Sequence, residues 1–469
     1  AAGGAMRITG SGRSLGTDVT RTLLFDGRGR FIDSLDGPLA QVGGFDGTDA
    51  WGSDWTGTSR KLVLGDAAGV VVEHALLTGS WCLSGAPFTF TLADAAPEGT
   101  RVLAWKHADG VLEGTLTLDA GTHLVRTATR GSGDQASSWT FQDYATTEGF
   151  SFPTRIEALE QGMPQRFEVR ARERLATADN ALFAAQVTLP SDTRYRTDVA
   201  PALEVKRVAS GHLLVHPTVD GEDLGWFIFD SGAGTNCIAL SVTDALAGEP
   251  FGQIGAKGVG GTVPSQFWRA EELALGPVVV ANPTFMGLDL AFLERAFGVE
   301  IGGILGYEFF SRCVVELDMQ GATIALHDPA RYELPAAGRW DEVLIYARHP
   351  CVRAGFEDHE GLFKIDTGAA GDTVTMHYDA VRELELLAGR ETKVSGAGGV
   401  GGTVVTRTGE LASFRLGGHA FEAIQASFAT EKKGAFADAY VQGNIGGKLL
   451  APFVLVFDYP HERLGFVPR

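Results

Sequence analysis

Short apolar runs, separated by turns rich in glycine and aspartate, dominate residues 1–172. Runs of this length between turn-forming residues are typical of β-strands. The clearest of them cover residues 61–65, 70–77, 88–92, 101–105 and 113–119. Five of the eight tryptophans also lie in this region, and we interpret them as core residues. The pattern therefore predicts an antiparallel β domain over residues 1–172.

Polar sequence of mixed charge follows, and it ends in residues 189–202, which contain two prolines. This composition is typical of a connection between domains. We therefore predict a linker over residues 173–202.

The remainder of the chain contains an internal repeat. The hexapeptide GVGGTV occurs at residues 258–263 and again at residues 399–404. Residues 304–318 align with residues 444–458 at nearly the same offset, and the segment FIFDSGAG has its counterpart in FKIDTGAAG. Blocks that recur in the same order indicate a duplicated domain.

Each copy contributes one Asp-(Ser/Thr)-Gly triplet. The triplets are Asp230-Ser231-Gly232 and Asp366-Thr367-Gly368. A pseudo-twofold axis can bring two equivalent loops together. Two carboxylates ~3 Å apart repel by ~5 kcal/mol at an effective dielectric constant of ~20, so the pair keeps one proton. One carboxyl can then act as general base and the other as general acid, with a water molecule as nucleophile.

The residues beside the two aspartates fit such a pair. Gly232 and Gly368 allow the two backbones to approach each other without a Cβ clash. Ser231 and Thr367 carry small hydroxyls, which we expect to bond to the backbone of the opposite loop.

The repeated glycine cluster suits a flexible hairpin tip that closes over bound substrate. An ordinary surface turn is the alternative for each copy. The candidate substrate-binding residues are Gly258, Val259, Gly260, Gly261, Gly399, Val400, Gly401 and Gly402.

Composition narrows the possible partners. The 469 residues carry a formal net charge of -19 at pH 7, which argues against a nucleic-acid partner. The longest apolar run, residues 449–457, is shorter than the ~18 residues needed to span a bilayer. We predict a buried strand there and no transmembrane segment.

The cysteines and histidines show no metal-ligand spacing that points to zinc, so no metal and no cofactor are expected.

Together these features resemble the aspartic proteases of the pepsin and retropepsin type. The resemblance implies a mainly β, bilobal fold with a double-ψ β-barrel in each lobe, over residues 203–335 and 336–469. It also implies an aspartic endopeptidase that hydrolyses peptide bonds with a water activated between Asp230 and Asp366. We expect peptide or protein substrates, and a monomer, because both halves of the site belong to one chain.

Departures from the pepsin pattern shape this expectation. The aromatic flap residue of pepsins has no clear equivalent beside GVGG, so the symmetric retropepsin-like arrangement fits better. Ala233 and Ala369 follow the triplets, as in retropepsins, where pepsins usually have a hydroxyl. Losing that hydrogen bond should raise the apparent pKa of the pair, so we predict a less acidic pH optimum than pepsin's. The apolar-apolar-Gly element that supports the catalytic loop in this family is present as residues 304–306. Its second copy, residues 444–446, begins with a polar Asn444.

The N-terminal region resembles the open β-sheet domains related to bacterial lipoprotein carriers. The similarity lies in residues 43–57, 116–130 and 141–157. It implies a location in the cell envelope, periplasmic or secreted. It also leaves open an alternative function, that of a non-catalytic envelope protein that binds peptide or lipid.

Overall fold

The chain forms two compact units. The first contains residues 1–189 and 251–255, and the second contains residues 190–250 and 256–469. The boundary at residue 190 lies within the segment that the sequence predicts to be a linker. The computed structural model describes residues 4–131, 136–160, 162–185 and 187–469.

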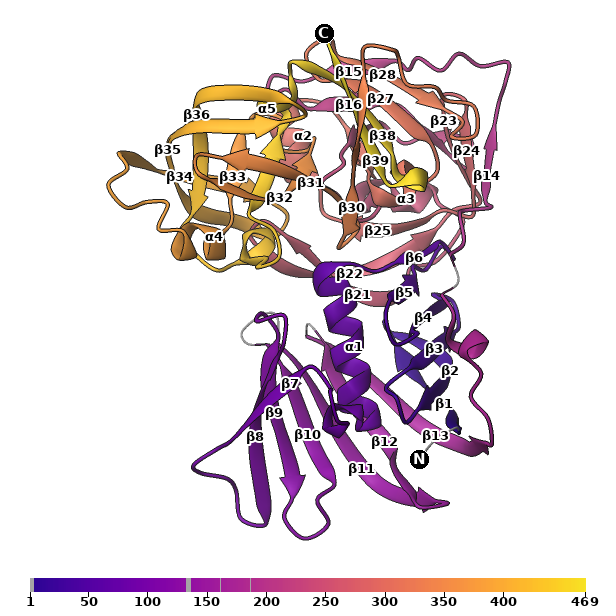
Figure 1. Ribbon diagram of the computed structural model, residues 1–469. Helices are drawn as coiled ribbons and strands as arrows, with labels where there is room; N and C mark the ends of the chain where they lie inside the picture. Colours follow the sequence, from indigo (N-terminus) through magenta and orange to yellow (C-terminus); the bar gives the residue numbers. More distant parts are fainter. Residues whose placement is uncertain (1–3, 132–135, 161, 186) are drawn as a thin grey trace. The chain divides into compact units, whose positions relative to one another are not determined.

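Within the described residues, the first unit is built on one antiparallel sheet of thirteen strands (Figure 1). The strands are β1 (Ala5–Ser14), β2 (Thr17–Asp26), β3 (Phe31–Asp36), β4 (Gln41–Phe45), β5 (Ala50–Ser53), β6 (Ser59–Lys61), β7 (Phe88–Leu92), β8 (Thr100–His107), β9 (Glu113–Asp119), β10 (Val125–Arg130), β11 (Ser137–Thr147), β12 (Phe150–Glu160) and β13 (Met163–Leu175). Their order is β6-β5-β4-β3-β2-β1-β13-β12-β11-β10-β9-β8-β7. The mainly β fold is confirmed, and the runs at 88–92, 101–105 and 113–119 are strands as predicted.

The strand prediction for residues 70–77 is wrong, because this run belongs to helix α1 (Leu64–Thr78). The run at 61–65 likewise leaves β6 and enters the same helix. Val72 and Leu76 lie one helical turn apart and are buried in one cluster with sheet residues such as Trp105. The β-branched residues favour a strand locally, but burial of this helical face overrides the local preference.

Two eight-stranded sheets of matching topology form most of the second unit, and only the first residues of β21 are assigned to the first unit. The first sheet consists, in spatial order, of β15 (Val205–Arg207), β16 (Leu213–Val215), β19 (Trp226–Phe229), β26 (Ile301–Leu305), β20 (Cys237–Ala239), β25 (Thr284–Leu288), β22 (Gly261–Arg269) and β21 (Phe251–Gly258). The second consists of β30 (Leu344–Tyr346), β31 (His349–Phe356), β32 (His359–Asp366), β37 (Gly443–Gly446), β33 (Val374–Met376), β36 (His419–Ala429), β35 (Gly402–Leu416) and β34 (Thr392–Gly399). Each strand of one sheet has its equivalent at the same place in the other, so the fold has the duplication that the sequence repeat indicates.

A third sheet joins the two copies. It consists of β28 (Thr323–His327), β27 (Val314–Asp318), β38 (Phe453–Asp458), β39 (Arg463–Pro468) and β29 (Arg339–Glu342). The equivalent strands β27 and β38 pair antiparallel at its centre. A further sheet of the first copy comprises β14 (Thr193–Tyr195), β24 (Val278–Ala281), β23 (Glu272–Leu275), β17 (Thr218–Val219) and β18 (Glu222–Asp223).

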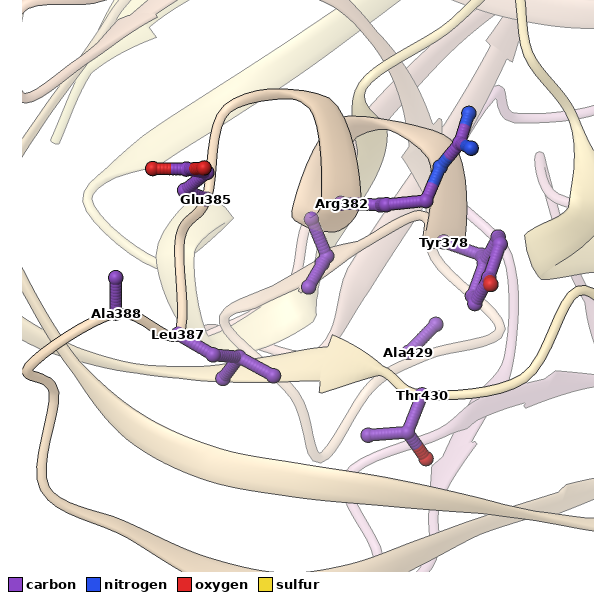
Figure 2. A pocket seen from close by; sticks show the side chains of 8 residues that line it. Tyr378, Arg382, Glu385, Leu387, Ala388, Ala429 and Thr430 are labelled. Atoms are coloured by element: carbon purple, nitrogen blue, oxygen red, sulfur yellow. The ribbon is translucent and has the colours of Figure 1, made fainter.

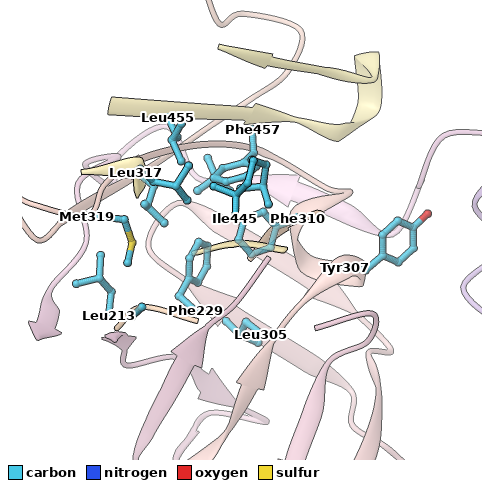
Figure 3. Close-up of a cluster of buried hydrophobic side chains, with 14 of the residues drawn as sticks. Leu213, Phe229, Leu305, Tyr307, Phe310, Leu317, Met319, Ile445, Leu455 and Phe457 are labelled. Atoms are coloured by element: carbon cyan, nitrogen blue, oxygen red, sulfur yellow. The ribbon is translucent and has the colours of Figure 1, made fainter. Parts of the chain in front are cut away.

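One apolar core runs through both copies of the second unit. Figure 3 shows Phe229 and Leu305 from the first copy and Ile445 from the second within this cluster. These residues come from the strands that carry or support the two aspartates, so the core fixes the position of both loops.

The apolar run at 449–457 is only partly the buried strand that its sequence predicts. Its first residues belong to the short helix α5 (Gly447–Leu450), and β38 begins at Phe453. Pro452 separates the two elements because proline cannot donate the backbone hydrogen bond that either would require there.

Truncating the apolar face of α1 should destabilise the first unit. Leu76 is 2% exposed, and Leu76→Ala is expected to lower the free energy of unfolding by ~2–5 kcal/mol. Leu159→Ala is the control, since Leu159 is 48% exposed, and it should change stability by less than ~0.5 kcal/mol. Urea denaturation followed by tryptophan fluorescence measures both. Equal effects of the two substitutions would contradict the packing described here.

Candidate active site

The two aspartates end equivalent strands and lie close together. Asp230 directly follows β19, and Asp366 is the last residue of β32. A Cβ atom on Gly232 would lie 2.2 Å from Oδ1 of Asp366, and one on Gly368 would lie 2.3 Å from Oδ2 of Asp230. No larger residue fits at either position, so glycine is what allows each loop to approach the opposite carboxyl.

Hydrogen bonds between the loops hold this arrangement. The Thr367 hydroxyl accepts from the Ser231 N–H at 2.9 Å and donates to the Phe229 carbonyl at 3.2 Å. The Ser231 hydroxyl accepts from the Thr367 N–H at 3.1 Å and donates to the Ile365 carbonyl at 2.8 Å. These are the bonds that the sequence leads us to expect of the two hydroxyls. Both side chains are buried, so the four bonds are protected from water.

The two carboxyls accept further hydrogen bonds, and their negative charges repel each other. Oδ1 of Asp230 accepts from the N–H groups of Gly232 at 2.7 Å and Gly368 at 2.9 Å. Burial, followed by the neighbouring charge of Asp366, raises the pKa of Asp230 to about 7. Burial also raises the pKa of Asp366. The pair therefore retains a proton at pH values where an isolated aspartate is ionised.

The apolar-apolar-Gly element lies beneath each loop. In the first copy β26 runs parallel to β19, and the carbonyl of Leu305 accepts from the Asp230 N–H at 3.0 Å. In the second copy β37 runs parallel to β32, with Gly446 opposite Asp366. A Cβ on Gly446 would lie 2.5 Å from the Ala369 carbonyl oxygen, so glycine is needed at this crossing.

Asn444 is a site residue that the sequence analysis treated only as a departure from the family pattern. Its amide donates to Oδ2 of Asp366 at 2.9 Å, and its Oδ1 atom lies 2.9 Å from Nε2 of His377. His377 is fully buried, and burial lowers the pKa of its imidazole to about 4. A polar residue in an otherwise apolar motif is the feature of the sequence that could have identified Asn444 as a site residue.

Two histidines at equivalent positions, which the sequence analysis did not single out, support the loops from the opposite copy. Nε2 of His212 lies 2.7 Å from the Gly368 carbonyl, and Nε2 of His349 lies 3.0 Å from the Gly232 carbonyl. Burial lowers the pKa of both rings, so each remains neutral near pH 7. The histidines differ in sequence position by 137 residues and the aspartates by 136, and this near-equal offset could have revealed the histidines.

The two glycine clusters form hairpin tips that touch each other. The first tip joins β21 to β22 and the second joins β34 to β35. The Gly260 N–H donates to the Val400 carbonyl at 3.0 Å, and a Cβ on Gly260 would lie 2.3 Å from the backbone of Gly401. The backbones of the two tips are in direct contact and leave no room for a side chain at positions such as Gly260, which explains why both tips are rich in glycine.

A pocket of about 280 Å³ opens beside helix α4 (Tyr378–Glu383) in the second copy (Figure 2). Tyr378, Leu387 and Ala429 are among the residues that line it. None of its lining residues belongs to either aspartate loop.

In the part of the chain that the structure describes, no three acidic, histidine or cysteine side chains are grouped so that they could hold a metal ion. No described helix has the length and apolar character to cross a membrane.

Comparison with known proteins supports an aspartyl-protease-like function in general. The family model described as aspartyl protease matches the chain twice, over residues 215–309 and 352–448, and each match includes one triplet. No curated protein matches the chain.

Two solved structures are similar at low identity. A LolA superfamily protein from Nitrosomonas europaea is 13% identical, with 39% of this chain and 90% of that chain covered and a TM-score of 0.30. Basic 7S globulin from soybean is 11% identical, with 57% and 94% covered and a TM-score of 0.34.

Removing one hydroxyl between the loops should destabilise the second unit. Thr367→Val leaves the buried N–H of Ser231 without its acceptor, at a cost of ~1–3 kcal/mol in the free energy of unfolding. Thr367→Ser keeps the hydroxyl and should recover most of that loss. Chemical denaturation of the two variants beside the wild type measures the difference. Equal stability of the valine and serine variants would contradict the role of these bonds.

The raised pKa values predict that the pair costs stability at high pH. Between the usual aspartate pKa and about 7 the folded state binds a proton more tightly than the unfolded state, so stability falls as the pH rises through this window. Asp230→Asn removes the repulsion while its amide oxygen can still accept both N–H groups. It should raise the melting temperature by several degrees at pH 8 and by much less at pH 4. A variant less stable than wild type at pH 8 would contradict the prediction.

Proposed function

We propose that this protein is an aspartic endopeptidase of the retropepsin-like type, with Asp230 and Asp366 as its catalytic pair. The observation that supports this most directly is the approach of each carboxyl to the opposite loop's glycine, held by the Ser231 and Thr367 hydroxyls. The family match over both copies agrees with it.

The chemistry follows from one proton shared by two carboxyls. The ionised carboxyl removes a proton from water, and the water oxygen forms a bond to the peptide carbonyl carbon. The protonated carboxyl gives its proton to the carbonyl oxygen, so a tetrahedral diol forms. The C–N bond then breaks while the first carboxyl passes its proton to the leaving nitrogen. The second carboxyl recovers a proton from the diol, and the pair returns to its starting state.

The two hairpin tips are suited to cover a bound peptide. They belong to separate copies and touch through Gly260 and Val400, so substrate entry requires them to part. Residues Gly258, Val259, Gly260, Gly261, Gly399, Val400, Gly401 and Gly402 are therefore proposed as the substrate-covering tips. The periplasmic or secreted location and the monomeric state stay predictions.

Peptide cleavage tests the proposal. The protein is incubated with a random peptide library from about pH 3 to about pH 8, with and without an inhibitor whose hydroxyl mimics the tetrahedral diol. Cleavage should be blocked by the inhibitor and should fall above pH 7 as the pair loses its last proton. Asp230→Asn and Asp366→Asn should each lower kcat/KM by ~10³-fold or more, because the two carboxyls act as a unit.

Asp244→Asn is the matched control, since Asp244 is exposed in the same unit, and it should leave cleavage unchanged. An optimum below about pH 3 would contradict the less acidic optimum predicted from Ala233 and Ala369. Peptide binding without cleavage at any pH would instead favour the non-catalytic binding protein.

A further inference from the structure

The two halves of the site differ at one equivalent position. Ile304 on β26 lies opposite Ile228, and Asn444 on β37 lies opposite Lys364, so the two residues occupy the same register in their copies. One offers an apolar side chain beneath its loop and the other an amide. At this position, therefore, the second copy has a side-chain hydrogen-bond donor and the first copy has an apolar side chain.

The orientation of the Asn444 amide follows from its neighbours. Nε2 of His377 lies 2.9 Å from the amide oxygen, and Nδ1 of the same ring lies 3.3 Å from the Asp438 carbonyl. A neutral imidazole has one N–H, and the shorter contact is the better hydrogen bond. With the proton on Nε2, the ring donates to the amide oxygen and the amide N–H₂ faces Oδ2 of Asp366 at 2.9 Å.

Each carboxyl accepts two N–H hydrogen bonds, but the bonds are distributed differently over the two oxygens. Both oxygens of Asp366 accept, Oδ1 from the Ala369 N–H at 3.0 Å and Oδ2 from Asn444. Both N–H groups on Asp230 go to Oδ1. Among the residues that the structure describes, no N–H group is bonded to Oδ2 of Asp230. Oxygens that accept N–H bonds favour the ionised carboxylate, and an oxygen without one is the place for a proton.

We propose that Asn444 is a positioning residue that keeps Asp366 ionised, so that the shared proton of the resting pair sits on Oδ2 of Asp230. The inference rests on the proposed function of the pair and assigns its two roles. Asp366 takes the proton from water, and Asp230 protonates the carbonyl oxygen of the peptide. His377 acts through Asn444 by holding the amide in the donating orientation.

The other ionisable groups around the pair do not provide this asymmetry by themselves. Burial raises the pKa of the Cys237 thiol and of the Tyr459 hydroxyl, so both stay neutral. Lys364 favours ionisation of Asp366 but is bonded to Asp438 at 2.8 Å, and Asp372 opposes that ionisation. Burial raises the pKa of Asp366. Among the groups that lower this pKa, the hydrogen bond from Asn444 has the largest effect.

Carbon-13 NMR of protein labelled at the aspartate carboxyl carbons locates the proton directly. Asp230→Asn and Asp366→Asn assign the two signals. In the wild type, over the pH range in which the pair holds one proton, the Asp366 signal should have the ionised chemical shift, while the Asp230 signal changes only near about pH 7. A protonated Asp366 beside an ionised Asp230, or equal titration of both, would overturn the proposal without any further variant.

Asn444→Ile installs the residue of the first copy and tests the cause. The titration midpoint of Asp366 should rise by about one unit or more, equivalent to a tenfold gain in proton affinity. kcat for peptide cleavage should fall about tenfold with little change in KM, and the pH profile should shift. Thr375→Val is the control, because Thr375 is buried opposite Asn444 on β33, and the titration should stay as in the wild type. An unchanged Asp366 midpoint in Asn444→Ile would refute the role of the amide.

The NMR experiment and the cleavage assay can refute the two proposals independently of each other. The carboxyl signals report the position of the proton whether or not any peptide is cleaved. Absence of cleavage by the wild type would defeat the proposed function, whereas a misplaced proton in an active enzyme would defeat only the assignment made here.

Discussion

Repulsion between two half-buried carboxyl groups is the interaction around which the second unit is organised. Left alone, Asp230 and Asp366 would move apart or draw in water. The surrounding structure opposes this with the hydrogen bonds of Ser231 and Thr367 across the two loops and with one apolar core beneath both. Glycines at positions 232 and 368 allow the close approach of the loops. The repulsion is relieved by keeping a proton instead, and that proton is what acid–base chemistry requires.

Duplication gives the two copies the same arrangement of strands, and individual residues make the two copies differ. Matching eight-stranded sheets bring equivalent loops to one place, and the paired strands β27 and β38 fix the copies against each other. His212 and His349 follow this symmetry, each bonded to the opposite loop. Asn444 breaks it, and an asymmetric pair is what a reaction with distinct acid and base steps can use.

The sequence predicted the repeat well because motifs in a duplicated chain can be compared with each other. The pairing of Asp230 with Asp366 and the bonds of their hydroxyl neighbours followed from that comparison. For residues 70–77 the local pattern predicts the wrong element, since β-branched residues favour strands locally and only the packing of Val72 and Leu76 shows the helix. The Asn444–His377 contact could not be predicted, because it joins residues 67 positions apart whose meeting depends on the sheet order.

The covalent connection between the two copies has a consequence for how the protein responds to concentration. In an assembly of two separate chains, a site built at the interface disappears on dilution as the chains dissociate. Here both loops belong to one chain and β27 pairs with β38 within it. The aspartate pair therefore forms by an intramolecular step, and its population does not depend on how much protein is present.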